Sequence, residues 1–103
     1  MQKSDFRGVF PALTTKMTAD QEVDLAAVKA DVAFQIEAGV DGIIVCGSLG
    51  EASSLTRDEK LAIAKAAIEV SAGRTPVLLT IAEDSTRAAA SLAAEAEQIG
   101  AEG

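Results

Sequence analysis

The stretch that decides the fold is DGIIVCGSLGEASSLT, residues 41–56. Its apolar run, Gly42–Cys46, is followed at once by Gly47-Ser-Leu-Gly50, a turn in which two glycines leave the backbone bare. A short and nearly all-apolar run is typical of a parallel strand that is buried on both faces. The turn after it has two interpretations: a simple change of chain direction, or a backbone kept free of side chains so that a ligand can approach.

Outward from this stretch, the chain alternates between apolar runs and helical patterns. Gly8–Thr14 and Val77–Ile81 predict two further strands, although Pro11 is unfavourable in a central strand. Capping-box spacing predicts helix starts at Thr18–Gln21 and Thr56–Glu59, and helical spacing of apolar residues follows both. The other expected helix limits are a cap for a third helix at Asp84 or Ser85 and glycine stops at Gly39, Gly73 and Gly100.

Three strands, each followed by a helix, predict a parallel α/β fold. Residues 39–42 read Gly-Val-Asp-Gly before the second strand, and residues 100–103 read Gly-Ala-Glu-Gly after the last helix. Unless this likeness is chance, the chain halts at the threshold of a fourth strand. About 30 residues per unit is also the spacing of a (β/α)8 barrel. We therefore expect residues 1–103 to be a single partial domain, the first three βα units of a TIM barrel; a complete flavodoxin-like domain would need about five strands.

Composition excludes several classes of function. Sixteen acidic against nine basic residues give a net charge of −7, which disfavours nucleic acid as a partner. No segment has the roughly 18 apolar residues of a membrane span, and the single cysteine, Cys46, suits a reducing cytoplasm. The absence of histidine removes the serine triad and the commonest nitrogen ligand of metals. We expect a cytoplasmic protein without a metal or cofactor, whose chemistry uses lysine, carboxylates, hydroxyls or backbone groups.

The glycine turn lies where parallel α/β proteins bind ligands, at the carboxyl end of a strand. Its backbone N–H groups could face an anion, and the Ser48 hydroxyl could donate to the same oxygen. Glu51 beside it disfavours a phosphate, so a carboxylate of single charge is the expected ligand. The alternative is a glycine-flanked βα turn in which Glu51 helps to cap the next helix.

Other polar residues are expected at the same end of the strands. Lys16 follows the first strand and could face the mouth of a barrel. Glu83 and Asp84 lie at the same rim as Ser48, where helix capping is favoured over acid–base chemistry. Cys46 is expected to be a small buried residue rather than a nucleophile. The lysines of the predicted helices are expected on solvated faces: Lys29, Lys60 and Lys65.

Several motifs together resemble one enzyme family. Gly-Ser-Leu-Gly-Glu at 47–51, after Asp-Gly-Ile-Ile-Val, resembles the G-[TS]-[TX]-G-E signature of the dihydrodipicolinate synthase and N-acetylneuraminate lyase family. Leu-Thr-Arg-Asp-Glu at 55–59 and Gly-Arg-Thr-Pro-Val at 73–77 are similar to the family's following helix start and to the beginning of its third strand. The resemblance covers nearly the whole chain. It implies a (β/α)8 barrel enzyme that is usually a dimer or tetramer. Such an enzyme would hold pyruvate or another 2-oxo acid as a lysine Schiff base.

By position, the resemblance implies that Ser48 contacts the carboxylate and joins a proton relay, as the catalytic residue of this chain. The backbone of Gly47, Ser48 and Leu49 would bind the substrate. Three departures put lysine biosynthesis in doubt: Leu49 stands in place of a common threonine, Lys16 in place of a proline, and residues 80–84 in place of a glycine-rich stretch.

The family's Schiff-base lysine and relay tyrosine lie on its sixth and fifth strands, and this chain has no tyrosine. The expected function is the N-terminal segment of a Schiff-base lyase, aldolase or dehydratase for a small 2-oxo acid, inactive alone and homo-oligomeric in its parent enzyme. The alternative is a non-catalytic fragment that folds by self-assembly or with the rest of the barrel.

Overall fold

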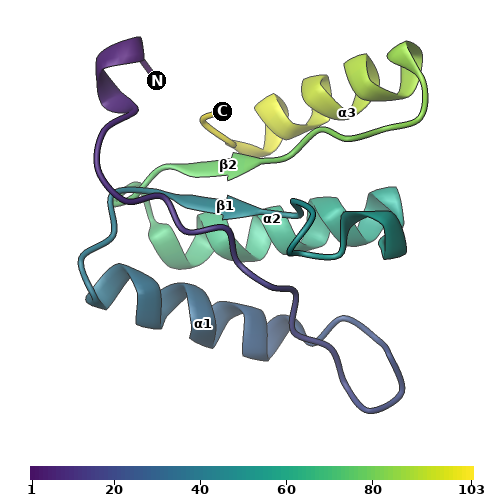
Figure 1. Ribbon diagram of the computed structural model, residues 1–103, viewed down its shortest axis with the longest axis horizontal. Helices are drawn as coiled ribbons and strands as arrows, with labels where there is room; N and C mark the ends of the chain where they lie inside the picture. Colours follow the sequence, from purple (N-terminus) through teal and green to yellow (C-terminus); the bar gives the residue numbers. More distant parts are fainter.

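The computed structural model describes residues 1–103 and shows two strands and three α-helices in alternating order (Figure 1). Two short 3-10 helices, η1 and η2, precede the first α-helix and the second. In chain order the elements are η1 (Lys3–Asp5), α1 (Leu25–Glu37), β1 (Ile43–Val45), η2 (Ala52–Ser54), α2 (Arg57–Ser71), β2 (Val77–Leu79) and α3 (Thr86–Ile99).

The two strands β1 and β2 are parallel and adjacent, with Ile43 paired to Val77 and Val45 to Leu79. Residues 43, 45, 77 and 79 are buried, whereas Ile44 at the middle of β1 is only partly buried. Because successive side chains of a strand point to opposite faces, one face of this sheet is well covered and the other less so. The expectation that the strand at Gly42–Cys46 is buried on both faces therefore holds for Ile43 and Val45 but not for Ile44, which is only partly buried.

The predicted first strand, Gly8–Thr14, shrinks to one parallel bridge between Ala12 and Ile44. The segment still runs beside β1, because the Ile44 amide donates to the Pro11 carbonyl (3.0 Å) and the Leu13 amide donates to the Ile44 carbonyl (2.9 Å). Pro11 has no N–H to extend a ladder, which explains why the pairing stays short.

The helix starts follow the predicted caps in two of three cases. Thr56 and Glu59 form the expected capping box of α2, and Ser85 rather than Asp84 caps α3 through the Ala88 amide. The start predicted at Thr18–Gln21 is wrong, because α1 begins at Leu25 with Asp24 as its cap. The Thr18 hydroxyl instead accepts a hydrogen bond from the Glu22 amide in a tight turn, where Gln21 has a φ of +66°.

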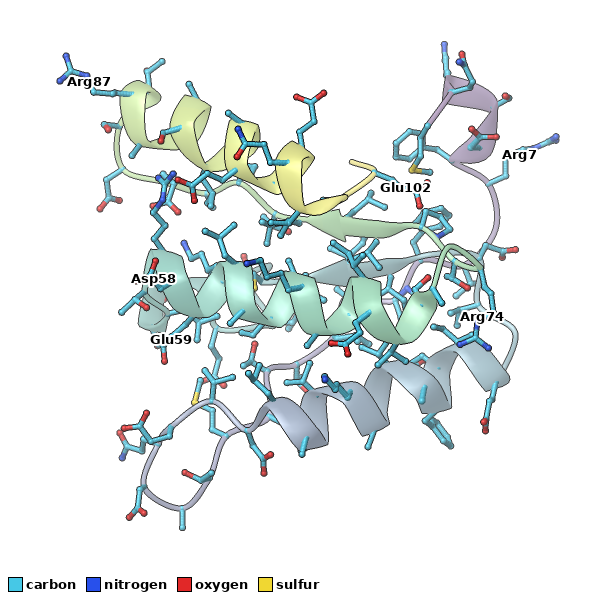
Figure 2. All side chains as sticks on the ribbon, turned by 180° about the vertical axis from the view of Figure 1, so that it is seen from behind. Arg7, Asp58, Glu59, Arg74, Arg87 and Glu102 are labelled. Atoms are coloured by element: carbon cyan, nitrogen blue, oxygen red, sulfur yellow. The ribbon has the colours of Figure 1, made fainter.

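The three helices cover one face of the sheet, and α2 lies directly against the strands between α1 and α3 (Figures 1 and 2). This arrangement buries one continuous apolar core. Val28 and Val32 of α1, Ile63 of α2 and Leu92 of α3 pack there against the strand residues. None of the helices combines the length and the apolar character that crossing a membrane requires.

The two copies of the short repeat take similar positions. Gly39 and Gly100 both have positive φ, at +93° and +100°, as expected of glycines that end helices. After Gly100 the chain turns back onto β2: the Glu102 amide donates to the Val77 carbonyl (2.9 Å), and the Leu79 amide donates to the Gly103 carbonyl (3.0 Å). The second copy therefore lies along the edge of β2 that does not face β1.

Candidate anion site at the carboxyl end of the strands

The Gly47–Gly50 turn begins one residue after Cys46, where β1 has ended. Cys46 and Glu51 both have a φ of +59°, so a left-handed residue stands on each side of the turn. Inside the turn, the Glu51 amide donates to the Ser48 carbonyl (3.1 Å) and the Ala52 amide donates to the Gly47 carbonyl (3.2 Å). These two bonds turn the carbonyls inward and fix a compact loop. Glu51 provides no side-chain cap, so the alternative capping role expected for it is wrong.

The two glycines of the turn are needed for different reasons. A Cβ on Gly50 would lie 3.1 Å from both the Cys46 nitrogen and the Leu13 carbonyl oxygen, so a side chain there would crowd backbone atoms and displace them slightly. A Cβ on Gly47 would meet the Thr80 hydroxyl at 3.4 Å, an ordinary contact. Gly50 is therefore favoured by close backbone packing, and Gly47 marks where the turn approaches the segment after β2.

The middle of the turn presents free hydrogen-bond donors to solvent. The amides of Ser48 and Leu49 donate to no acceptor within the chain, and both residues are exposed. Leu49 is 67% exposed. Two adjacent amides and a serine hydroxyl provide the donors that a carboxylate needs.

A buried hydrogen bond holds the turn against the first segment of the chain. The Thr15 hydroxyl donates to the Gly50 carbonyl at 2.6 Å, and Thr15 is buried. No other donor of the chain reaches that carbonyl. The threonine therefore sets the position of the turn from a site 35 residues away in the sequence.

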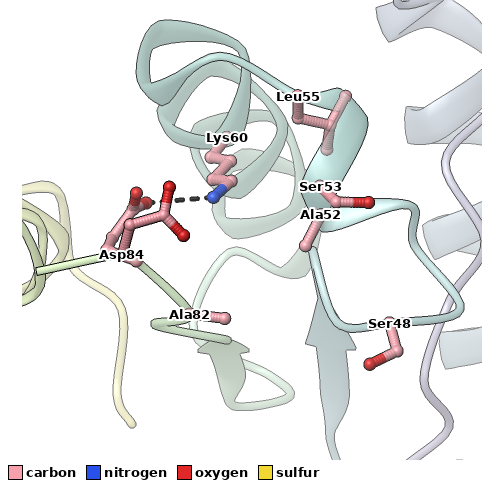
Figure 3. A pocket seen from close by; sticks show the side chains of 8 residues that line it. Ser48, Ala52, Ser53, Leu55, Lys60, Ala82 and Asp84 are labelled. Atoms are coloured by element: carbon pink, nitrogen blue, oxygen red, sulfur yellow. Dashed lines mark hydrogen bonds and ion pairs between the residues drawn. The ribbon is translucent and has the colours of Figure 1, made fainter.

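A hollow of about 410 Å³ opens beside the turn, between it, the start of α2 and the segment that follows β2. Ser48 lies on one side, and Lys60 and Asp84 lie on the other (Figure 3). The prediction that Ser48, Glu83 and Asp84 share one rim is confirmed, because all three line this hollow. The remaining lining residues are Ala52, Ser53, Leu55, Lys60 and Ala82.

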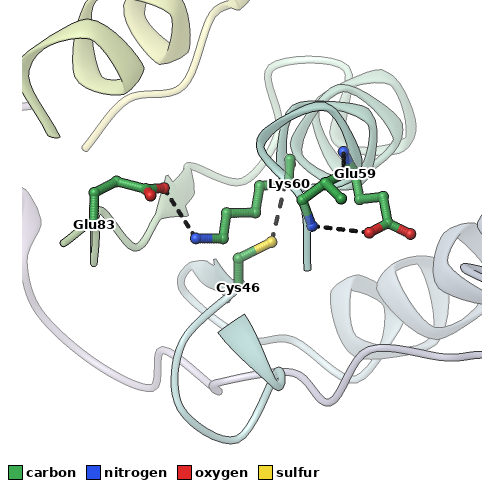
Figure 4. Close-up of polar contacts among 5 residues, drawn as sticks. Cys46, Glu59, Lys60 and Glu83 are labelled. Carbon is green, nitrogen blue, oxygen red and sulfur yellow. Dashed lines mark hydrogen bonds and ion pairs between the residues drawn. The ribbon is translucent and has the colours of Figure 1, made fainter. Parts of the chain in front are cut away.

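Lys60 is not on a solvated face, and that prediction is wrong. Its Nζ lies 2.9 Å from Glu83 Oε1, with the two side chains 5% and 21% exposed (Figure 4). The lysine lies on the first turn of α2 and points across to the residues after β2. The expected capping role of Glu83 is wrong for the same reason: its carboxylate neutralises a buried ammonium group. No local pattern predicts this pair, whose members are 23 residues apart.

Cys46 is buried, as predicted, and its thiol contacts the Lys60 carbonyl at 3.9 Å (Figure 4). Burial raises the pKa of the thiol from 9.0 to about 11, although the positive charge of Lys60 acts in the opposite direction. A protonated thiol is a poor nucleophile at neutral pH, so Cys46 fills space beneath the turn.

The remaining candidates lie away from the hollow. Lys16 is exposed and its Nζ contacts the Thr14 hydroxyl at 3.2 Å, so it does not line the hollow beside Ser48. Lys29 pairs with Glu69 across the helix surface, with both side chains well exposed. The structure brings together no group of three or more Cys, Asp or Glu side chains that could hold a metal ion.

Parallel βα units with a polar turn at the carboxyl end of a strand are consistent with a (β/α)8 barrel, whose active sites are built from such turns at that face. Comparison with known proteins supports this fold and identifies the enzyme family. The sequence model described as the dihydrodipicolinate synthetase family matches residues 5–103. The chain belongs to this family.

Three relatives illustrate the range of the family. The chain is 38% identical over 98 residues to a 4-hydroxy-tetrahydrodipicolinate synthase of Salinibacter ruber, covering 95% of this chain and 32% of the relative. It is 37% identical over 95 residues to an L-2-keto-3-deoxyarabonate dehydratase of Azospirillum brasilense, covering 92% and 31%. A prophage protein of the same family from E. coli K12, solved in complex with pyruvate, superposes with a TM-score of 0.82 at 39% identity, covering 94% and 33%. The chain spans about a third of the length of these relatives.

Proposed function

We propose that this chain supplies the carboxylate-binding part of a site for pyruvate or another small 2-oxo acid, within a Schiff-base lyase, aldolase or dehydratase. The observation that carries the proposal is the pair of free amides at Ser48 and Leu49, exposed at the carboxyl end of β1. Membership of the family supports it, and so does the pyruvate complex described for the E. coli relative.

In this proposal the Ser48 and Leu49 amides bind one carboxylate oxygen, and the Ser48 hydroxyl binds the other and joins a proton relay. Gly47 allows the substrate to approach the backbone. The exposed leucine gives the site an apolar wall where a threonine would add a hydroxyl. The proposal does not choose between a synthase substrate and a dehydratase substrate, because both kinds of enzyme occur among the relatives.

The covalent step is assigned to a lysine that this chain does not provide. A Schiff-base lysine must be uncharged to attack a carbonyl. Lys60, the lysine in the hollow beside Ser48, is instead held in an ion pair with the Glu83 carboxylate 2.9 Å away. We therefore propose that the chain is inactive alone, and that the parent enzyme is a cytoplasmic homo-oligomer.

Binding can be measured on the 103-residue chain by nuclear magnetic resonance of the backbone amides. Pyruvate is expected to shift the Ser48 and Leu49 amide signals, and Ser48→Ala is expected to weaken the affinity roughly tenfold, because a hydrogen bond to a charged group is lost. Ser53→Ala removes an exposed hydroxyl from the same hollow and serves as the matched control. Equal affinity in wild type and Ser48→Ala, or shifts confined to other residues, would refute the assignment.

The assignment of the covalent step has its own test. After incubation with pyruvate and borohydride, the mass of the intact chain is expected to show no reduced adduct. An adduct would contradict the division of roles, and peptide mapping would then examine Lys60 first because it shares the hollow with Ser48.

The second candidate function is that of a non-catalytic segment that assembles with copies of itself. It is favoured by the face of the sheet without helices, where Ile44 and Leu78 are incompletely buried. Sedimentation velocity distinguishes the two: association that increases with concentration supports assembly, and a monomer at micromolar concentration opposes it.

A further inference from the structure

The buried ion pair between Lys60 and Glu83 differs from the other ion pairs of the chain. The side chains of Lys29 and Glu69 are 42% and 72% exposed, whereas those of Lys60 and Glu83 are 5% and 21% exposed. Exposed pairs contribute little, but breaking a buried pair by removing one partner leaves an uncompensated charge. Removing either side chain of this pair is therefore expected to be costly.

The pair connects two elements that meet at the glycine turn. Lys60 lies in the first turn of α2, and its carbonyl contacts the thiol of Cys46, the residue immediately before Gly47. Glu83 lies after β2, in the segment that begins with Thr80. Figure 4 shows the side chain of Lys60 extending toward Glu83, with Cys46 beside it.

That segment is also in contact with the turn itself. The Thr80 hydroxyl lies 3.4 Å from the position that a Cβ on Gly47 would occupy, and the Thr80 amide donates to the Val45 carbonyl at 3.1 Å. The hollow contains two carboxylates, Glu83 and Asp84, and one ammonium group. Without Lys60, two negative charges would face the place where a substrate carboxylate is proposed to bind.

We propose that Lys60 and Glu83 are positioning residues: their ion pair fixes the segment from Thr80 to Asp84 against the Gly47–Gly50 turn and so shapes the carboxylate site. The inference rests on the proposed function for its effect on affinity. Its structural part, the fixed distance between the turn and the segment, does not depend on any ligand.

The test uses the 103-residue chain and two readouts. The first, without ligand, is the nuclear Overhauser effect between the Gly47 α-protons and the Thr80 side chain, together with amide exchange in the turn. The second is the pyruvate affinity reported by the Ser48 and Leu49 amides. The control variant is Lys65→Met, which removes an exposed lysine from the same helix.

Lys60→Met and Glu83→Gln are expected to abolish the Gly47–Thr80 Overhauser effect and to accelerate amide exchange in the turn about tenfold more than exchange in the middle of α2. Lys60→Arg keeps the charge pair and is expected to behave as wild type in both measurements. If a single variant fails to fold, the double variant Lys60→Met/Glu83→Leu removes both charges together and is expected to fold. The folded double variant should show no Gly47–Thr80 Overhauser effect and should bind pyruvate about threefold to tenfold more weakly than wild type.

Two results would overturn the inference. One is a wild-type Gly47–Thr80 Overhauser effect and unchanged turn exchange in a folded double variant. The other is a folded double variant that melts at a lower temperature but binds pyruvate with wild-type affinity, which would make the pair purely structural. Failure of the proposed function looks different, because wild type would then show the Overhauser effect but no response of the turn to pyruvate.

Discussion

Replacing Thr15 by valine tests how the turn is held in place. The substitution keeps the shape of the side chain but removes the hydroxyl that donates to the Gly50 carbonyl at 2.6 Å. Because no other donor of the chain reaches this carbonyl, it would be left without a partner beneath the turn. An unsatisfied buried polar group costs about 1–3 kcal/mol, a large fraction of the roughly 5–15 kcal/mol that stabilises a typical domain.

For a domain of this size, that loss corresponds to a fall in Tm of roughly 5–20 °C. The chain has neither tryptophan nor tyrosine, so far-ultraviolet circular dichroism is the suitable probe of unfolding. Thr15→Ser retains the hydroxyl and should lose much less stability than Thr15→Val. The reasoning would be refuted if valine left the free energy of unfolding within about 0.5 kcal/mol of wild type, the range of neutral surface substitutions.

Three further substitutions report on the turn and its supports. Gly50→Ala should cost roughly 1–3 kcal/mol in urea unfolding because its Cβ would crowd the Cys46 nitrogen at 3.1 Å; a neutral result would contradict the packing described. Thr56→Ala should lower the free energy of unfolding by about 1 kcal/mol, because it removes the hydroxyl that accepts a hydrogen bond from the Glu59 amide at the start of α2. The control Thr86→Ala, at an exposed threonine, should leave stability unchanged. Burial raises the pKa of the Cys46 thiol from 9.0 to about 11 in the folded chain, so below pH 9 the thiol is protonated in both the folded and the unfolded state. Between pH 9 and about 11 only the unfolded chain releases the proton, so the free energy of unfolding should fall by roughly 2–3 kcal/mol as the pH rises. Cys46→Ala should lack this additional decline.

Local patterns predicted the fold well where one element contains all the information. The capping box of Thr56 and Glu59 starts α2, and the apolar run before Gly47 forms β1, close to the predicted limits. The same spacing at Thr18–Gln21 failed because the side chain of Thr18 caps a tight turn rather than a helix. The Thr56 hydroxyl accepts from the amide three residues on, as a helix cap does, whereas the Thr18 hydroxyl accepts from the amide four residues on.

The site was predictable only in part, because its supports are not local. The glycines and Ser48 are visible in the sequence as a turn after a strand. The Thr15–Gly50 hydrogen bond joins residues 35 apart, and the Lys60–Glu83 pair joins residues 23 apart. A lysine in an amphipathic helix normally faces solvent. Its burial here depends on a carboxylate that the fold brings to it.

The most direct test of the central claim is a crystal structure of this chain grown with pyruvate. The account predicts a pyruvate carboxylate oxygen within hydrogen-bond distance, about 2.7–3.2 Å, of the Ser48 and Leu49 amide nitrogens, with the Ser48 hydroxyl on the other oxygen. Pyruvate bound beside Lys60 without contact to the turn, or a turn left empty at saturating pyruvate, would contradict the claim that the bare backbone after β1 is the carboxylate site.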